Sequence, residues 1–186
     1  MKKEVEKRKA DGIVDYAALA LTTFGVGYIP GAPGTYGSAV GVGIYVFVAA
    51  FEVHAGAHNA INGQVPALVI AFHSALNAIL LTAFCLAGIW ASGRSIPLLG
   101  SDDPSEAVVD EVMGQLTTFL FIPFGLSWPF LLAGFLLFRI FDIWKPYPID
   151  DLQNLPGGLG VCADDIIAGA YAGICLAVGY AVTLSL

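Results

Sequence analysis

The residues best suited to chemistry begin with a charged stretch at the end of a long apolar run, residues 138–148. Arg139 and Asp142 stand three positions apart and would share one helix face. Pro146 should end that helix just after Lys145, so two cations and one anion would lie at a helix end beside apolar surface. One interpretation is a site for a charged ligand. The other is a juxtamembrane ion pair from which Lys145 extends to the membrane interface.

Two acidic pairs lie in equally apolar surroundings, Asp110 with Glu111 and Asp164 with Asp165. A carboxylate beside a bilayer is costly unless it is paired or binds a cation, so the repeated placement indicates a site. The nearby basic residues are too few to neutralise these acids. A divalent metal is the simplest neutraliser, and all-oxygen ligation favours Mg²⁺, Mn²⁺ or Ca²⁺ over zinc.

A glycine-rich loop at residues 25–38 leads into a predicted helix and carries Thr35 and Ser38. Free backbone amides at a helix N-terminus suit a phosphate oxyanion, because the helix dipole also favours negative charge. The loop lacks the Gly-Lys-Ser/Thr ending of a nucleotide-binding loop, which excludes that interpretation. The alternative is that Gly37 and Gly41 allow close helix packing, and both interpretations can hold together.

The composition defines the class of protein in which these residues act. The chain of 186 residues fits a single domain, residues 1–186, and 57% of its residues are hydrophobic while 12% are charged. We therefore expect an all-α, multi-helical integral membrane protein with several transmembrane or re-entrant helices. A net charge of −7 argues against nucleic acid as a partner. The basic segment 1–12 places the N-terminus in the cytoplasm.

Hydropathy predicts membrane spans near residues 38–53, 66–90 and 166–186. Residues 13–29 are too short and too interrupted for a confident span, so we expect an amphipathic or re-entrant helix there. Asp103 resembles a helix N-cap, which predicts that the helix carrying Asp110 begins at residue 104.

Residues 116–138 pose a topological problem, because a single crossing would put Asp110 and Asp142 on opposite sides of the membrane. Pro123, Gly125 and Pro129 interrupt this run. We expect a bent or re-entrant segment that enters the membrane and returns to the same side.

Four blocks, taken together and in order, resemble the phosphatidylglycerophosphatase A family. They are GVGYIPGAPGTYGS at 25–38, DEVMG at 110–114, FRIFDIWKPYP at 138–148 and DDIIAG at 164–169. The resemblance implies an all-helical Mg²⁺-dependent phosphatase, with Mn²⁺ as a possible substitute. It would convert phosphatidylglycerophosphate to phosphatidylglycerol at the cytoplasmic face of a bacterial inner membrane.

The chemistry of the residues agrees with that implication, because a phosphate monoester would be repelled by carboxylates unless a metal bridged them. We assign the metal shell to Glu111, Asp142, Asp164 and Asp165, with Asp110 as a ligand or a neighbour of the ligands. Phosphoryl oxygens would be held by Arg139 and Lys145, assisted by Thr35 and Ser38. The expected catalytic set is Asp110, Glu111, Asp142, Lys145 and Asp165. Water is favoured over an aspartyl nucleophile.

Two other classes of protein compete with the phosphatase. A small cation- or proton-coupled transporter could use the same carboxylates to carry ions, although the acids lie at segment ends and no internal repeat is present. A membrane scaffold with interfacial charges would tolerate replacement of the acids. The sequence carries no signal for an oligomeric state.

Overall fold

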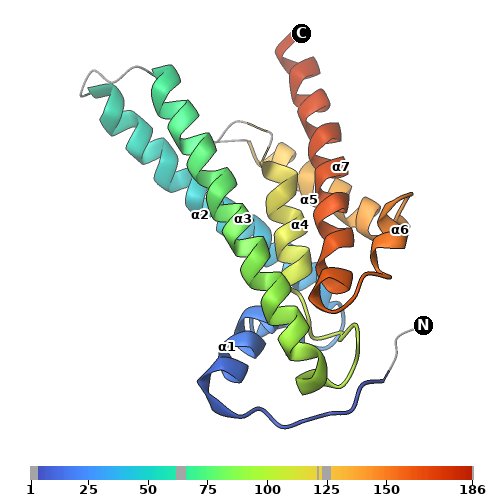
Figure 1. Ribbon diagram of the computed structural model, residues 1–186. Helices are drawn as coiled ribbons and strands as arrows, with labels where there is room; N and C mark the ends of the chain where they lie inside the picture. The colour runs from blue at the N-terminus through green and yellow to red at the C-terminus, as the bar shows by residue number, and fades with distance from the viewer. Residues whose placement is uncertain (1–3, 62–65, 121, 123–126, 186) are drawn as a thin grey trace.

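The computed structural model describes residues 4–61, 66–120, 122 and 127–185, and these residues form an all-helical bundle (Figure 1). In chain order the elements are α1 (Gly12–Thr23), the 3₁₀ turn η1 (Val26–Tyr28), α2 (Pro33–Ile61), α3 (Pro66–Leu99), α4 (Val109–Phe119), α5 (Trp128–Trp144), α6 (Ile149–Leu152) and α7 (Gly158–Ser185). Stretches of α2, α3 and α7 are long and apolar enough to cross a membrane, which confirms the predicted fold class. All three helices extend beyond the predicted spans at the end where the charged residues gather.

Helix α4 lies at the centre and packs against α2, α3, α5 and α7. Its Val109, Val112 and Met113 are fully buried. Glycines on the neighbouring helices allow the close approach: Gly41 of α2 faces the Gln115 side chain, and Gly169 of α7 lies against the α4 backbone. The predicted packing role of the α2 glycines is therefore confirmed.

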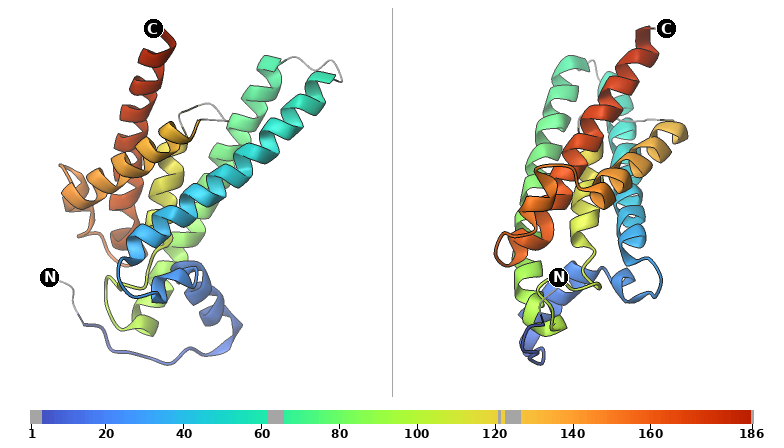
Figure 2. Two further views of the ribbon diagram at one scale, coloured as in Figure 1. Left: turned by 180° about the vertical axis from the view of Figure 1, so that it is seen from behind. Right: turned by 90° about the vertical axis from the view of Figure 1, so that its right-hand side faces the viewer.

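Helices α4 and α5 bring Asp110 and Asp142 to one end of the bundle, as the prediction for residues 116–138 required, while the entry of this segment into the membrane stays a prediction. α4 has 11 residues and α5 has 17, so they are about 16 and 25 Å long, each shorter than a bilayer core of about 30 Å. α5 slopes back from the far end of α4 toward α6 (Figure 2). Pro129 lies in the first turn of α5, while Pro123 and Gly125 fall outside the described residues.

Helix α1 lies across the end of α3, as Figures 1 and 2 show. Asp15 of α1 is buried and pairs with Arg94 Nε of α3 at 2.7 Å and with Arg8. The chain before α1 follows the end of α3, where Arg8 N donates to Pro97 O at 2.9 Å. The expected helix at 13–29 thus ends at Thr23 and packs against the cavity end of the bundle.

The predicted start of α4 at residue 104 is wrong, because the helix begins at Val109. Ala107 N donates to Pro104 O in a turn, and Val108 N donates to Thr22 O of α1. The helix therefore begins about one turn later than predicted, just after the residue that bonds to α1. This later start places Asp110 and Glu111 in the first turn of α4, where the helix dipole favours negative charge.

Candidate active site

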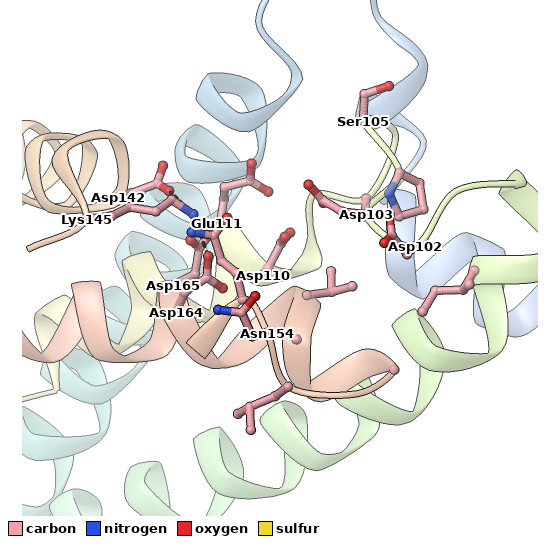
Figure 3. A pocket seen from close by; sticks show the side chains of 18 of the residues that line it. Asp102, Asp103, Ser105, Asp110, Glu111, Asp142, Lys145, Asn154, Asp164 and Asp165 are labelled. Carbon is pink, nitrogen blue, oxygen red and sulfur yellow. Dashed lines mark hydrogen bonds and ion pairs between the residues drawn. The ribbon is translucent and has the colours of Figure 1, made fainter. Parts of the chain in front are cut away.

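A polar cavity of about 760 Å³ lies where α4 begins, α5 ends and α7 begins (Figure 3). These three helix ends bring together both acidic pairs and the charged stretch after α5. The titratable residues that line the cavity are Asp102, Asp103, Asp110, Glu111, Asp142, Lys145, Asp150, Asp164 and Asp165. Among the lining residues that the structure describes, Lys145 is the sole lysine or arginine.

Asp110, Glu111 and Asp165 form the centre of this cavity. One carboxylate oxygen from each lies within 4.8 Å of the others, and Asp110 and Asp165 are buried. Asp110 Oδ1 and Glu111 Oε2 are buried without a hydrogen-bond partner. Three converging carboxylates, two of which have a buried oxygen without a hydrogen-bond partner, fit a hard divalent cation that takes oxygen ligands.

The electrostatics of α4 agree with this donor set. Burial raises the pKa of Asp110 well above its ordinary value, and the neighbouring charge of Glu111 raises it further. Burial likewise raises the pKa of Glu111. Ionising both of these adjacent buried carboxyl groups therefore costs free energy, and a bound cation would offset this cost.

Lys145 reaches the same cavity from the end of α5. It has a left-handed backbone conformation with φ of 45°, and Lys145 N closes the helix by donating to Phe141 O. Lys145 Nζ lies 2.5 Å from Asp164 Oδ2 and 3.9 Å from Asp142 Oδ1. Burial lowers the pKa of Lys145, but the hydrogen bond and charge of Asp164 outweigh it, so the net pKa is raised. Lys145 is therefore a fixed cation beside the carboxylates.

The structure separates the residues assigned to the metal shell into two groups. Glu111 and Asp165 converge with Asp110, whereas Asp142 and Asp164 engage cations: Arg139 Nη1 lies 2.6 Å from Asp142 Oδ2, and Lys145 holds Asp164. All five carboxylates still line one cavity. Their individual roles remain predictions.

The residues assigned to phosphoryl binding are also divided. Lys145 lines the cavity, but Arg139, Thr35 and Ser38 are absent from its described lining. Arg139 Nη1 lies 3.5 Å from Ser38 Oγ, which donates to Gly34 O at 2.8 Å. Arg139 therefore lies at the contact between α5 and the start of α2, where a Cβ at Gly34 would meet both Arg139 Nη1 and Glu111 Oε1.

Sequence reasoning missed one side of the cavity, which we call the outer wall. It consists of Asp102, Asp103, Ser105, Asp150, Gln153 and Asn154. These residues belong to the segment before α4 and to α6 with the turn after it. Polar residues are common in loops and by themselves indicate no site. The signal that could have identified these residues is their position in the sequence, shortly before the two helices that begin with acidic pairs.

The fold and cavity define a class: an all-helical membrane protein with a carboxylate and lysine site at one end of its bundle. The family model of phosphatidylglycerophosphatase A matches residues 19–180. The chain belongs to this family and is a phosphatase, as the resemblance of the four blocks indicated.

Curated relatives agree with the family assignment. The chain is 31% identical over 159 residues to phosphatidylglycerophosphatase A of Escherichia coli, covering 84% of this chain and 80% of the relative. It is 33% identical over 151 residues to the Haemophilus influenzae protein of the same name, covering 80% and 79%. It is 36% identical over 158 residues to a putative phosphatidylinositol-3-phosphatase of Bacteroides thetaiotaomicron, covering 84% and 89%. No solved structure matches the chain.

Proposed function

We propose that the protein removes the terminal phosphate of phosphatidylglycerophosphate to give phosphatidylglycerol, with Mg²⁺ bound in the cavity. The observation that carries this proposal is the convergence of Asp110, Glu111 and Asp165 beside Lys145 at the end of membrane-spanning helices. A phosphate monoester is a dianion and needs cations to enter such an acidic cavity. A transporter is not favoured, because the chain belongs to a phosphatase family.

The chain's own residues have three tasks in this reaction. Asp110, Glu111 and Asp165 would hold Mg²⁺, or Mn²⁺ in its place. The bound ion would neutralise phosphate charge and polarise the phosphoryl group. Lys145 would donate hydrogen bonds to a phosphoryl oxygen, and its pairing with Asp164 fixes the direction of its ammonium group.

Hydrolysis breaks the bond between phosphorus and the headgroup oxygen and forms a bond from phosphorus to a water oxygen. The attacking water loses a proton, the departing headgroup oxygen gains one, and inorganic phosphate leaves. We favour attack by water over an aspartyl nucleophile, because no separate base and nucleophile can be distinguished among the described carboxylates of the cavity.

A second candidate substrate is phosphatidylinositol 3-phosphate, because the Bacteroides thetaiotaomicron relative is named for it. Both substrates are phosphate monoesters on a lipid headgroup. The charged centre of the cavity serves either one, so substrate choice depends on the remaining walls.

The test is phosphate release from phosphatidylglycerophosphate by the purified protein in detergent, with Mg²⁺ and with a chelator. Asp165→Asn should lower release at least about 100-fold while the protein stays folded, because a ligand charge is lost. Asp151→Asn is the matched control, since Asp151 is exposed on α6 and absent from the described cavity lining. Full phosphate release in the presence of the chelator would contradict the role of the metal. Phosphate release from phosphatidylinositol 3-phosphate, with none from phosphatidylglycerophosphate, would identify the former as the substrate.

A further inference from the structure

Helix α1 has the reverse polarity of an ordinary surface helix. Its polar side chains Asp15, Thr22 and Thr23 are buried, whereas Ile13 is 84% exposed and Tyr16 is 62% exposed. A surface helix in water places its polar side chains outward and its apolar side chains toward the core. The exposed side of the helix, which we call the outer face of α1, consists of Ile13, Tyr16, Ala17 and Ala20. This face is apolar except for the Tyr16 hydroxyl.

The protein itself satisfies the polar side chains on the buried side of α1. Asp15 pairs with Arg94 Nε at 2.7 Å, and Thr22 Oγ1 lies 3.0 Å from Ser95 Oγ, both on α3. Thr23 Oγ1 donates to the α1 backbone at 2.9 Å. These three side chains therefore need no water, which is the condition for a helix that contacts lipid.

The contacts between α1 and α3 place α1 beside membrane-spanning surface. Phe24, which follows the last residue of α1, contacts Phe84 edge to face, with ring centroids 6.3 Å apart. Phe84 belongs to the stretch of α3 that is long and apolar enough to cross a membrane. Figures 1 and 2 show α1 on the outside of the bundle, across α3. The outer face of α1 is therefore continuous with the exposed apolar surface of α3.

Exposed aromatic side chains mark a membrane boundary at this end of the bundle. They are Tyr16 on α1, Trp90 on α3, Trp144 at the end of α5 and Tyr147 shortly after it. Lys145, the neighbour of Trp144, lines the cavity. Trp and Tyr are enriched at both surfaces of a membrane, because their rings are apolar and each carries one polar group. The headgroup boundary of the bilayer therefore fits the level of α1.

We propose that α1 is an interfacial helix whose outer face rests in the bilayer leaflet at the cavity end. The partner of this face is the phospholipid bilayer, with the Tyr16 hydroxyl at the headgroups and the apolar side chains below them. Such a helix enters about 5–10 Å into the boundary between headgroups and acyl chains. Val108 N donates to Thr22 O at 2.9 Å, so the depth of α1 also sets the height of the α4 start relative to the headgroups. This placement holds whichever phosphate ester the cavity takes.

The test places nitroxide spin labels at Ile13→Cys and Tyr16→Cys in a variant without the native cysteines, reconstituted in phosphatidylcholine nanodiscs. Glu6→Cys, in the segment before α1, is the aqueous reference, and Ile79→Cys, on α3, is the lipid reference. All four positions are exposed, so the labels leave core packing intact. Electron paramagnetic resonance compares collisions with oxygen, which concentrates in lipid, and with a water-soluble nickel chelate. The labels on α1 should collide with the chelate at least about 5-fold less often than the Glu6→Cys label.

Two results would overturn the interfacial placement of α1. Chelate collisions as frequent as those of the Glu6→Cys label would place the outer face in water. Shielding of the α1 labels from both oxygen and the chelate would show that protein covers the face. In that case, spin–spin broadening that disappears when unlabelled protein is mixed in before reconstitution would identify the cover as a second copy of the chain.

Discussion

Lys145 is the residue whose environment most directly links structure to substrate charge. Its ammonium group lies between Asp164 and Asp142, so it is positioned before any substrate arrives. Lys145→Ala should lower kcat/KM for phosphatidylglycerophosphate by about 10- to 100-fold, because the phosphoryl group loses a charged donor. Steady-state phosphate release measures the effect.

The same change should lower thermal stability, because it leaves the buried Asp164 carboxylate without its cation. The control is Lys9→Ala, which removes an exposed lysine from the segment before α1. An unaltered kcat/KM in Lys145→Ala would show that the pair with Asp164 is structural.

At the scale of elements, the contact between α4 and α7 sets the distance between their carboxylates. A Cβ at Gly169 would clash with the backbone of Gly114, whereas a Cβ at Gly179 on the same helix would meet no atom within 4 Å. Gly169→Ala should therefore push α7 from α4, costing about 1–3 kcal/mol and reducing activity on the order of 100-fold.

Gly179→Ala should instead leave activity unchanged and stabilise α7 by about 0.5–1 kcal/mol. Thermal unfolding in detergent and phosphate release, measured on both variants, separate packing from chemistry. Equal behaviour of the two variants would mean that the tight contact at Gly169 does not position the site.

The elements also show what the sequence could predict. The sequence could predict that α4 and α5 bring Asp110 and Asp142 to the same end of the bundle, because the two residues could share a site in no other way. It could not predict which carboxylates and cations pair with one another. Adjacent residues on a helix diverge by about 100°, so helix crossing decides that Asp165 meets Asp110 while Asp164 meets Lys145. The start of α4 depends on a bond to Thr22 of α1, which is distant in sequence.

At the scale of the molecule, Asp15 joins the N-terminal segment, α1 and the end of α3. The hydrogen bond from Arg8 holds the pKa of Asp15 well below its usual range, aided by Asp11 N and Arg94 and opposed by burial. The ionised carboxylate therefore stabilises the fold above the ordinary aspartate pKa, and this contribution is lost as pH falls through the lowered value. The melting temperature of Asp15→Asn should therefore be lower than that of wild type at neutral pH.

The difference between Asp15→Asn and wild type should narrow only at acidic pH, below the usual aspartate range. Thermal unfolding at several pH values checks this, with Asp11→Asn as the control because the Asp11 side chain makes no cap hydrogen bond. A difference that is constant with pH would contradict the ionised pairing.

The charge distribution of the whole molecule also predicts its orientation. The basic segment with Lys7, Arg8 and Lys9 follows the end of α3, where Arg8 N donates to Pro97 O and both Arg8 and Arg94 pair with Asp15. Ile96 in this part of α3 lines the cavity, and basic residues that flank membrane helices favour the cytoplasm. In a variant without the native cysteines, Ser105→Cys should react with a membrane-impermeant maleimide in inside-out vesicles and stay unlabelled in intact spheroplasts. Ser185→Cys, at the far end of α7, should show the reverse pattern. Labelling of Ser105→Cys from the outside would place the cavity on the other face and contradict the predicted cytoplasmic orientation.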